Sequence, residues 1–402
     1  MRARFLGSPW RVLARAGAVV FVLVATLRSG GTDLPAGWAH CLACGDLAAA
    51  EVVQNLFLFV PFGLAFGLRA AKPARVVLAG FLFSLAVEVV QHRLPGRDPS
   101  LADVLFNTMG TAAGVRFALA APVLLAPPER WAPWLGLASA LLATAVLGAT
   151  GILFQTADQD PAVMRWVPDL PRLPRYGGRV TAAELGPVPL APGPVPDPAG
   201  TWARWAAGEP LDVTLVLGPA PGAFAPIVAI MTAHDERLLV LGAARHDLAV
   251  WPRTRAAAWH LDQPDLRLRG ALAGMKPGDT VHVTVARQAN AYCLGVGAAR
   301  RSCFAYGIGQ GWALVLYPES VPPWLRRLGG LAWLAALAWP AGVWWRRHAA
   351  SVGAVALLGA AIILAPLITG LRPAGPLEVG AVAAGVALGV LAMRTRLAAA
   401  ER

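Results

Sequence analysis

The fold depends on the stretch Glu88-Val-Val-Gln-His-Arg-Leu-Pro-Gly-Arg-Asp-Pro-Ser-Leu-Ala-Asp-Val-Leu-Phe-Asn-Thr-Met-Gly-Thr-Ala-Ala-Gly114. It begins at the end of one apolar helix, crosses a polar turn broken by Pro95-Gly96, and enters a second apolar helix. Glu88, Gln91 and His92 are spaced three and four residues apart, so they share one face of the first helix. Polar groups are rare in apolar helices, because each one left unpaired in hydrocarbon is costly. These three side chains therefore mark a candidate site.

The second helix of the stretch carries a matching polar stripe. Asp103 and Asn107 lie four residues apart near its start, and Gly110 and Gly114 continue the same face. Small residues at such a spacing let two helices approach each other closely. We therefore expect this face to pack against another helix and to carry polar groups at one end.

This pattern of residues resembles the VanZ-like family of membrane proteins, which is named for a teicoplanin-resistance protein. The family signature reads Glu-x-x-Gln, an Arg-containing turn, and then Ser-x-x-Asp-x-x-x-Asn-x-x-Gly-x-x-x-Gly. An upstream segment, Asn55–Gly63, also looks like the family's, whereas Glu51 stands where the family pattern leads us to expect Asp. The resemblance covers roughly the first third of the chain and implies a link to the cell envelope and to glycopeptide tolerance. The signature places are held here by Glu88, Gln91, Arg97, Ser100, Asp103, Asn107, Gly110 and Gly114.

The composition is typical of an integral membrane protein. Of the 402 residues, 56% are hydrophobic and only 14% are charged, whereas soluble proteins carry about 25% charged residues. The mean hydropathy is +0.55. The net charge of +12 arises from 35 Lys and Arg against 23 Asp and Glu, but many of these basic residues flank apolar segments, where they act as topology signals. A nucleic-acid surface needs basic residues gathered on a soluble face, so we expect no nucleic-acid partner.

Hydropathy predicts about eight membrane spans, each close to the roughly 20 residues that cross a bilayer. The basic N-terminal segment precedes an apolar run without a clear small-x-small cleavage site, so we expect an uncleaved first helix. The predicted spans are Trp10–Leu27, Val52–Leu68, Ala74–Val90, Val104–Leu125, Trp131–Phe154, Leu328–Trp345, Val352–Leu371 and Leu377–Met393.

Basic residues predict the orientation, because they favour the cytoplasmic side of a membrane. The N-terminal arginines, the turns around Lys72 and Arg346, and the C-terminal tail all fall on one side of the predicted spans. We therefore expect cytoplasmic termini in a bacterial-type cytoplasmic (inner) membrane. The turn 92–102 and the long polar interval between the fifth and sixth spans then lie outside. Arg326 and Arg327 also fall on the outer side and oppose this assignment.

Short alternating segments within the polar interval predict an antiparallel β-sandwich. Val281, Val283 and Val285 alternate with polar residues, as a half-buried strand requires. Many short strands between Gly and Pro turns favour a sandwich. The pattern from Gly278 to Gly295 resembles the central hairpin of laminin G-like or concanavalin A-like domains. The predicted strands are Leu211–Leu217, Pro226–Met231, Leu238–Leu241, Leu248–Trp251, Leu266–Leu268, Thr280–Val285, Tyr292–Val296 and Trp312–Tyr317.

The predicted fold class is an α-helical polytopic membrane protein with an inserted all-β sandwich. We expect a Pro-rich, extended linker between the fifth span and the sandwich. The expected segments are a VanZ-like four-helix membrane unit (1–126), a fifth transmembrane helix (127–154), the linker (155–200), the extracytoplasmic sandwich (201–320), and three C-terminal transmembrane helices with a cytoplasmic tail (324–402).

The four cysteines form two close pairs, and both pairs fall on the predicted outer side. Cys293 and Cys303 flank a predicted hairpin tip, so we expect a disulfide in an oxidising compartment. Cys41 and Cys44 leave three alternatives: a disulfide that stiffens the loop, a redox pair, or a zinc site with His40. The disulfide is favoured, and zinc is the weakest alternative because the sequence offers no obvious fourth ligand. We expect no metal and no cofactor.

The predicted topology brings the polar ends of three helices to one depth near the outer headgroup region. The candidate binding residues are Asn55, Glu88, Gln91, Arg97, Ser100, Asp103 and Asn107, with His92 beside them. One interpretation is structural, in which Asp103 caps its helix and Arg97 pairs with Glu88. Asn55 then bridges to Asn107. The other interpretation is binding, because a buried acid beside an arginine suits a lipid headgroup, a phosphate or a peptidoglycan stem carboxylate.

The functional hypotheses differ in what the polar cluster does. The favoured one is a non-enzymatic binding or accessory protein, with membrane lipids and an envelope glycan or lipid-linked precursor as partners. The alternative is a membrane-embedded enzyme acting on a lipid-linked precursor, with Glu88 or Asp103 as general acid/base. It is weaker because no nucleophile or metal accompanies the acid. A third hypothesis is an assembly scaffold, in which the sandwich holds a protein partner of unknown identity.

Overall fold

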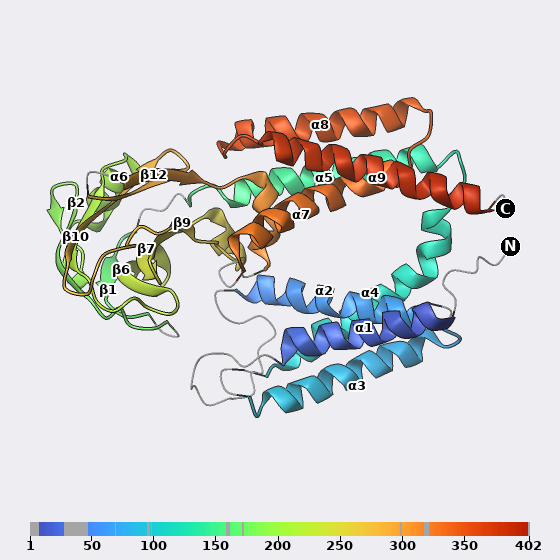
Figure 1. The fold of residues 1–402 in the computed structure, drawn as a ribbon, viewed down its shortest axis with the longest axis horizontal. Helices are drawn as coiled ribbons and strands as arrows, with labels where there is room; N and C mark the ends of the chain where they lie inside the picture. Colours follow the sequence, from blue (N-terminus) through green and yellow to red (C-terminus); the bar gives the residue numbers. More distant parts are fainter. Residues whose placement is uncertain are drawn as a thin grey trace. The chain divides into compact units, whose positions relative to one another are not determined.

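The computed structural model describes residues 8–27, 47–68, 70–94, 97, 99–157, 161–170, 173–297, 300–316 and 321–400. The chain divides into two units, Met1–Trp131 and Ala132–Arg402. Helices build the described part of the first unit. The second unit combines a β-sandwich with helices that precede and follow it in the chain (Figure 1).

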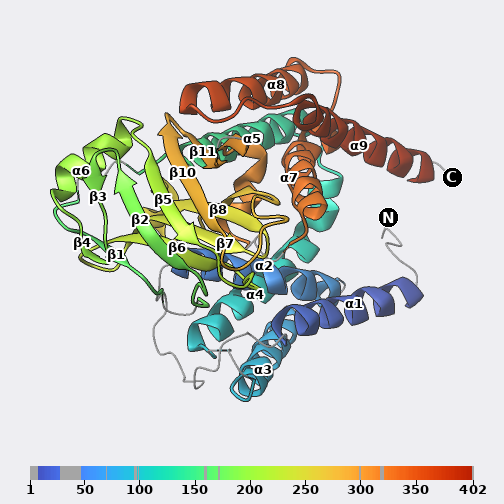
Figure 2. The same ribbon diagram turned by 60° about the vertical axis from the view of Figure 1, so that its left-hand side comes forward.

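Four long helices make up the described part of the first unit, and they lie side by side in both views (Figure 1, Figure 2). Each has the length and apolar character needed to cross a membrane. Large apolar side chains such as Phe57 and Phe117 are more than half exposed, as expected for positions that face lipid. The helices are α1 (Ser8–Thr26), α2 (Ala48–Gly67), α3 (Pro73–Gln91) and α4 (Leu101–Leu125).

Glycines allow α2 and α4 to touch through their backbones. A Cβ atom on Gly110 would overlap the carbonyl oxygen of Leu56, and one on Gly114 would overlap that of Val60. Gly63 of α2 faces α4 in the same way, because its Cβ would come within 2.9 Å of Gly114 Cα. The predicted close-packing role of Gly110 and Gly114 is therefore confirmed, since a side chain at either position has no room in this crossing.

Aromatic rings fill the space between α2 and α3. The ring of Phe59, which is fully buried, lies 5.8 Å from the ring of Phe83, and the Phe62 ring lies 5.5 Å from the same ring. Phe62 also stacks on Phe66 with 4.5 Å between the ring centroids. The segment 55–63 therefore presents rings to α3 and glycine to α4, which holds α2 against both helices.

Four long helices of the second unit lie together at one end of its β domain (Figure 1). Three of them, α5, α8 and α9, bring to seven the described helices that are long and apolar enough to span a membrane. The chain is thus a multi-pass helical membrane protein with an inserted β domain, as predicted. The remaining helix, α7, has 21 residues and carries Arg326 and Arg327 near its start. The bounds are α5 (Ala132–Leu153), α7 (Pro323–Val343), α8 (Ala349–Thr369) and α9 (Pro376–Ala400).

Two antiparallel sheets of six described strands each form the sandwich, in the orders β4-β1-β6-β7-β8-β9 and β12-β11-β10-β5-β2-β3. A short helix, α6 (Pro198–Ala206), and two 3-10 helices, η1 (Arg255–Trp259) and η2 (Ile308–Leu314), accompany them. The strands are β1 (Met164–Val167), β2 (Arg179–Leu185), β3 (Val188–Pro189), β4 (Gly193–Pro194), β5 (Leu211–Val216), β6 (Ala225–Thr232), β7 (Arg237–Ala244), β8 (Asp247–Pro252), β9 (Leu266–Leu268), β10 (Thr280–Gln288), β11 (Ala291–Val296) and β12 (Arg300–Ala305).

Seven of the eight predicted strands are confirmed, with shifts at their ends, as β5 to β11. The prediction for Trp312–Tyr317 is wrong in the described residues, because this segment begins inside η2. There Gly311 packs so closely on α5 that a Cβ would lie 2.6 Å from Thr150 Oγ1. The prediction of a Pro-rich linker over 155–200 is also wrong. This stretch supplies β1 and β4 to one sheet and β2 and β3 to the other, so it belongs to the sandwich.

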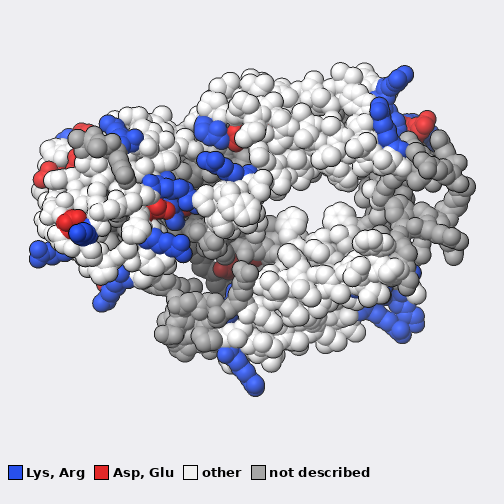
Figure 3. Space-filling view, viewed as in Figure 1, with Lys and Arg blue, Asp and Glu red and all other residues white. Residues whose placement is uncertain are grey.

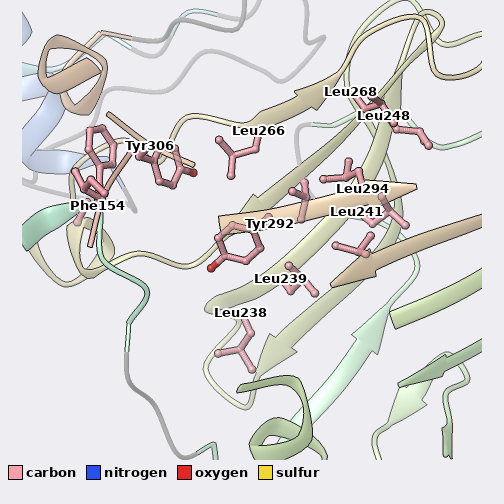
Figure 4. Close-up of a cluster of buried hydrophobic side chains, with 14 of the residues drawn as sticks. Phe154, Leu238, Leu239, Leu241, Leu248, Leu266, Leu268, Tyr292, Leu294 and Tyr306 are labelled. Carbon is pink, nitrogen blue, oxygen red and sulfur yellow. The ribbon is translucent and has the colours of Figure 1, made fainter. Parts of the chain in front are cut away.

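The core of the sandwich lies between the two sheets. Val281, Val283 and Val285 of β10 are buried and alternate with more exposed neighbours, which confirms the predicted pattern. Figure 4 shows Leu294 of β11 beside Leu241 of β7, so strands from both sheets meet in this cluster. Both leucines are fully buried.

The sandwich is fastened to the ends of the helices. Phe154, which follows α5, stacks on Tyr306 with 4.6 Å between the ring centroids (Figure 4). Gln155 Nε2 donates to the carbonyl oxygen of Thr369, at the end of α8, over 3.0 Å. Asn290, in the turn between β10 and β11, donates to the same oxygen over 3.2 Å. These contacts place the base of the sandwich at the level where α5 and α8 end.

Arg326, the arginine that opposes the predicted orientation, has a partner in the sandwich. Its Nη1 lies 3.6 Å from Oδ1 of Asp265, whose side chain is fully buried. Arg267 Nε donates to the other carboxylate oxygen of Asp265 over 2.7 Å. Arg326 thus holds α7 to the sandwich, and this structural role accounts for a basic residue there.

Candidate functional site

The candidate site begins with a direct bond between α2 and α4. Asn55 Nδ2 donates to Asp103 Oδ1 over 2.7 Å. Asp103 lies in the first turn of α4, where the N–H groups of the helix favour a carboxylate. Glu51, in the first turn of α2, is exposed and close enough to act electrostatically on Asp103. The Asn55 amide therefore joins two helices that already touch through their glycines.

Glu88 links the end of α3 to the start of α4. Its side chain is buried, with the residue only 2% exposed, and Oε2 accepts a hydrogen bond of 3.0 Å from the backbone N–H of Ser100. Ser100 is also the N-cap of α4, because its hydroxyl oxygen accepts from the N–H of Ala102 over 3.1 Å. The interpretation that Asp103 caps this helix is therefore wrong. Asp103 lies three residues further on and binds Asn55 instead.

Arg97 brings these two acidic groups into one charged cluster. It lies on the turn between α3 and α4, is partly exposed, and acts electrostatically on both Glu88 and Asp103. The two carboxylates are also near enough to interact with each other. Glu88, Arg97 and Asp103 thus form the charged part of the site, with Asn55 and Ser100 as hydrogen-bond donors to the two acids.

Asn107 lies deeper between α3 and α4 than the charged cluster. Its Nδ2 donates to the hydroxyl of Ser84 over 2.9 Å, and both residues are buried. The prediction that Asn55 bridges to Asn107 is wrong, since Asn55 binds Asp103. Within the described residues, Asn107 Oδ1 is buried and has no hydrogen-bond partner. Ser84 was not predicted, although its place four residues before Glu88 puts it on the same helical face.

Gln91 faces α1 and not the charged cluster. Its Nε2 donates to the carbonyl oxygen of Thr26 over 3.0 Å, and the residue is 8% exposed. The hydroxyl of Thr26 in turn donates to Val22 within the same helix over 2.8 Å. Gln91, one of the predicted binding residues, therefore holds α3 to α1. His92, the next residue, is exposed.

The cysteine prediction for the sandwich is confirmed. Cys293 and Cys303 form a disulfide and are directly opposite each other on β11 and β12. The alternatives for Cys41, Cys44 and His40 fall on residues outside those that the structure describes. Among the described residues, no group of three or more His, Cys, Asp or Glu side chains could hold a metal ion.

Comparison with known proteins bears on the first unit. Residues 16–124 match the family model VanZ/LLP1, which is about a quarter of the chain. The matched region includes α2, α3 and α4 up to its penultimate residue, and hence the whole candidate site. No family match covers the sandwich, so its likeness to laminin G-like or concanavalin A-like domains stays a prediction. Comparison with curated proteins and with solved structures gave no match.

Proposed function

We propose that the first unit is a non-enzymatic binding module for a lipid or glycan of the cell envelope, and that Arg97 contacts an anionic group of this ligand. The observation that carries the proposal is the position of Arg97, partly exposed beside two acidic groups at the ends of three apolar helices. Such a cationic group at the edge of the hydrocarbon suits a phosphate or a carboxylate in the headgroup region.

The neighbours of Arg97 favour a fixed guanidinium group. Glu88 and Asp103 each accept a hydrogen bond from a donor of their own, Ser100 N–H and Asn55 Nδ2. These bonds hold the two carboxylates in place, and the carboxylates orient Arg97 by charge. A guanidinium carries five N–H groups, so it can hold such neighbours and a planar anion at the same time.

The VanZ/LLP1 match supports a role at the cell envelope, and the resemblance of the signature residues suggests a link to glycopeptide (teicoplanin) tolerance. The proposed location is a bacterial-type cytoplasmic membrane with the sandwich on the outer side. This placement puts the candidate site in the outer headgroup region, where envelope lipids and lipid-linked precursors expose their polar groups.

The enzymatic alternative requires Glu88 or Asp103 to reach a substrate. Glu88 is almost fully buried, and its Oε2 is occupied by the backbone of Ser100. Asp103 is less buried but is held by Asn55. Both acids therefore suit a positioning role better than proton transfer to a substrate, which favours binding over catalysis.

The test compares two arginines of the same turn. Arg97→Ala removes the proposed contact, and Arg93→Ala removes an exposed charge of the same sign from the same turn. Each variant is purified in native membrane nanodiscs, the copurifying lipids and glycans are identified by mass spectrometry, and teicoplanin tolerance is measured at matched protein abundance. We expect Arg97→Ala to lose a bound component that Arg93→Ala retains, with partial recovery in Arg97→Lys.

Two results would speak against the proposal. If Arg97→Ala retains the bound component and full tolerance at normal abundance, Arg97 has no binding role. If Glu88→Gln keeps binding but abolishes turnover of a lipid-linked precursor, the enzymatic alternative replaces the binding module. A Glu88→Gln protein that is fully functional excludes acid/base chemistry at this residue.

A further inference from the structure

A second cluster of charges lies in the other unit, where the sandwich meets α7. Its centre is Asp265, whose fully buried side chain binds Arg267 through Oδ2 and lies 3.6 Å from Arg326 Nη1 through Oδ1. Asp247, on the neighbouring strand β8, accepts from Gly270 N–H over 2.7 Å and lies 3.9 Å from Arg267 Nη1. Both carboxylates are therefore held by partners within the protein.

A third arginine, Arg269, lies at the edge of this cluster. Within the described part of the chain, the two carboxylates pair with Arg267 and Arg326 and not with Arg269. Asp247, Asp265, Arg267 and Arg326 all act on it electrostatically. Partial desolvation, and next the positive charge of Arg326, lower the pKa of Arg269 from its ordinary value. Three arginines thus share two aspartates, and the residual positive charge lies at Arg269, which is exposed.

The cluster lies at the boundary between helices and sandwich. Arg326 is in the first turn of α7, and Trp324 beside it is 63% exposed. Exposed Trp at the end of a membrane helix is typical of the headgroup level. Figure 3 shows basic and acidic side chains gathered between the sandwich and the helices of this unit, while the sides of these helices are mostly uncharged on the visible face. The surplus charge is therefore at the depth of lipid phosphates if the helices span a bilayer.

We propose that Arg269 and Arg326 bind the phosphate of an anionic phospholipid at this boundary. Arg326 is fixed by Asp265, and Arg269 supplies the uncompensated charge. An anionic headgroup would neutralise it, and the two guanidinium groups can offer the phosphate several N–H donors at once. This site is separate from that proposed around Arg97 and does not depend on which side of the membrane the sandwich occupies.

The test uses the full chain in nanodiscs and the variant Arg269→Gln. This variant leaves the ion pair between Arg326 and Asp265 intact, so the contact between α7 and the sandwich is retained. Arg179→Gln, which removes an exposed arginine from β2 in the other sheet, is the matched control. The probes are dioleoyl phosphatidylglycerol in a phosphatidylcholine disc, and inorganic phosphate added to a disc of phosphatidylcholine alone. The readout is the thermal unfolding midpoint.

We expect phosphatidylglycerol to raise the midpoint of the wild type and of Arg179→Gln by about 3 °C or more, and that of Arg269→Gln by less than half as much. An equal rise in wild type and Arg269→Gln would overturn the proposal. If inorganic phosphate alone reproduces the full rise, the site binds free phosphate and the lipid assignment is wrong. If phosphatidylglycerol produces no rise in the wild type, the site binds no anionic lipid.

Discussion

The backbone N–H of Ser100 donates to the buried carboxylate of Glu88 over 3.0 Å, so the residue that starts α4 is tied to the last full turn of α3. The same residue caps α4 with its hydroxyl. One serine therefore serves two helices, through its main chain toward Glu88 and through its side chain toward Ala102. The two functions can be separated by mutation, because a substitution removes the hydroxyl and leaves the N–H.

Ser100→Ala removes the cap and keeps the bond to Glu88. We expect a loss of about 1 kcal/mol in stability, which is the usual cost of removing an N-cap side chain. Thermal unfolding of the purified protein in detergent measures it. Ser139→Ala is the control, because Ser139 lies within α5 and its hydroxyl only donates to Gly136 of the same helix. Equal midpoints for Ser100→Ala and the wild type would show that this cap is dispensable.

Gly110→Ala tests the contact between α2 and α4. A methyl group there overlaps the carbonyl oxygen of Leu56 and forces the helices apart, so we expect a loss of about 1–3 kcal/mol or failure to accumulate. Gly17→Ala in α1 is the control, because its Cβ would meet nothing within 4 Å. In helices Ala is favoured over Gly by up to about 1 kcal/mol, so this variant is expected to be neutral or more stable. A Gly110→Ala protein as stable as Gly17→Ala would contradict the close crossing.

Removal of the disulfide should weaken the sandwich. Cys293 and Cys303 are ten residues apart, and closing such a loop stabilises by about 2.5 kcal/mol in the chain-entropy model. We expect Cys303→Ser to unfold at a lower temperature than the wild type, and dithiothreitol to lower the wild-type midpoint by a similar amount. The double variant Cys41→Ser/Cys44→Ser is the control and should keep its response to dithiothreitol. Loss of that response would assign the effect to the N-terminal pair.

Cysteine labelling in intact cells tests the proposed orientation. Single cysteines replace Ala70, in the turn between α2 and α3, or Ala220, an exposed loop residue of the sandwich. Cys41 and Cys44 are changed to Ser, and the native disulfide is left in place. We expect an impermeant maleimide to label Ala220→Cys and to spare Ala70→Cys, because basic residues favour the inner side. The opposite pattern would invert the whole topology.

The helices could be predicted from sequence, whereas five of the twelve described strands, β1 to β4 and β12, could not. An apolar run of about 20 residues has few alternatives to a membrane helix. The eight predicted spans correspond to the eight long helices described, of which seven, all but α7, are long and apolar enough to span a membrane. The strands within 155–200 were not predicted, because this stretch is rich in proline and proline is rare in strands. Pro189 and Pro194 lie in β3 and β4, which are the edge strands of their sheets. At an edge, a missing N–H need not remove a ladder bond, so proline is tolerated there.

The members of the candidate site were predictable, but their pairing was not. Helical spacing placed Asp103 and Asn107 on one face, yet Asp103 binds α2 and Asn107 binds α3. Which neighbour each side chain reaches depends on how three helices cross. The crossing of α2 and α4 is set by the contacts of Gly63 and Gly110, and that of α3 and α4 by the contact of Gly80 with Thr111. Ser84 was not predicted, because a single serine in an apolar run does not indicate a site unless its hydrogen-bond partner, Asn107, is known.

The hydrogen bond between Gln155 and Thr369, which joins the start of the sandwich to the end of α8, forms between residues that are synthesised far apart in time. Gln155 and Thr369 are 214 residues apart in the chain, and a ribosome adds about 5–20 residues per second. The acceptor for Gln155 is therefore made on the order of 10–40 s after Gln155 itself. During that interval every strand of the sandwich emerges, but α8 has yet to enter the membrane. Until α8 is made, α5 and α7 are the only described long helices of its own unit on which the β domain can pack.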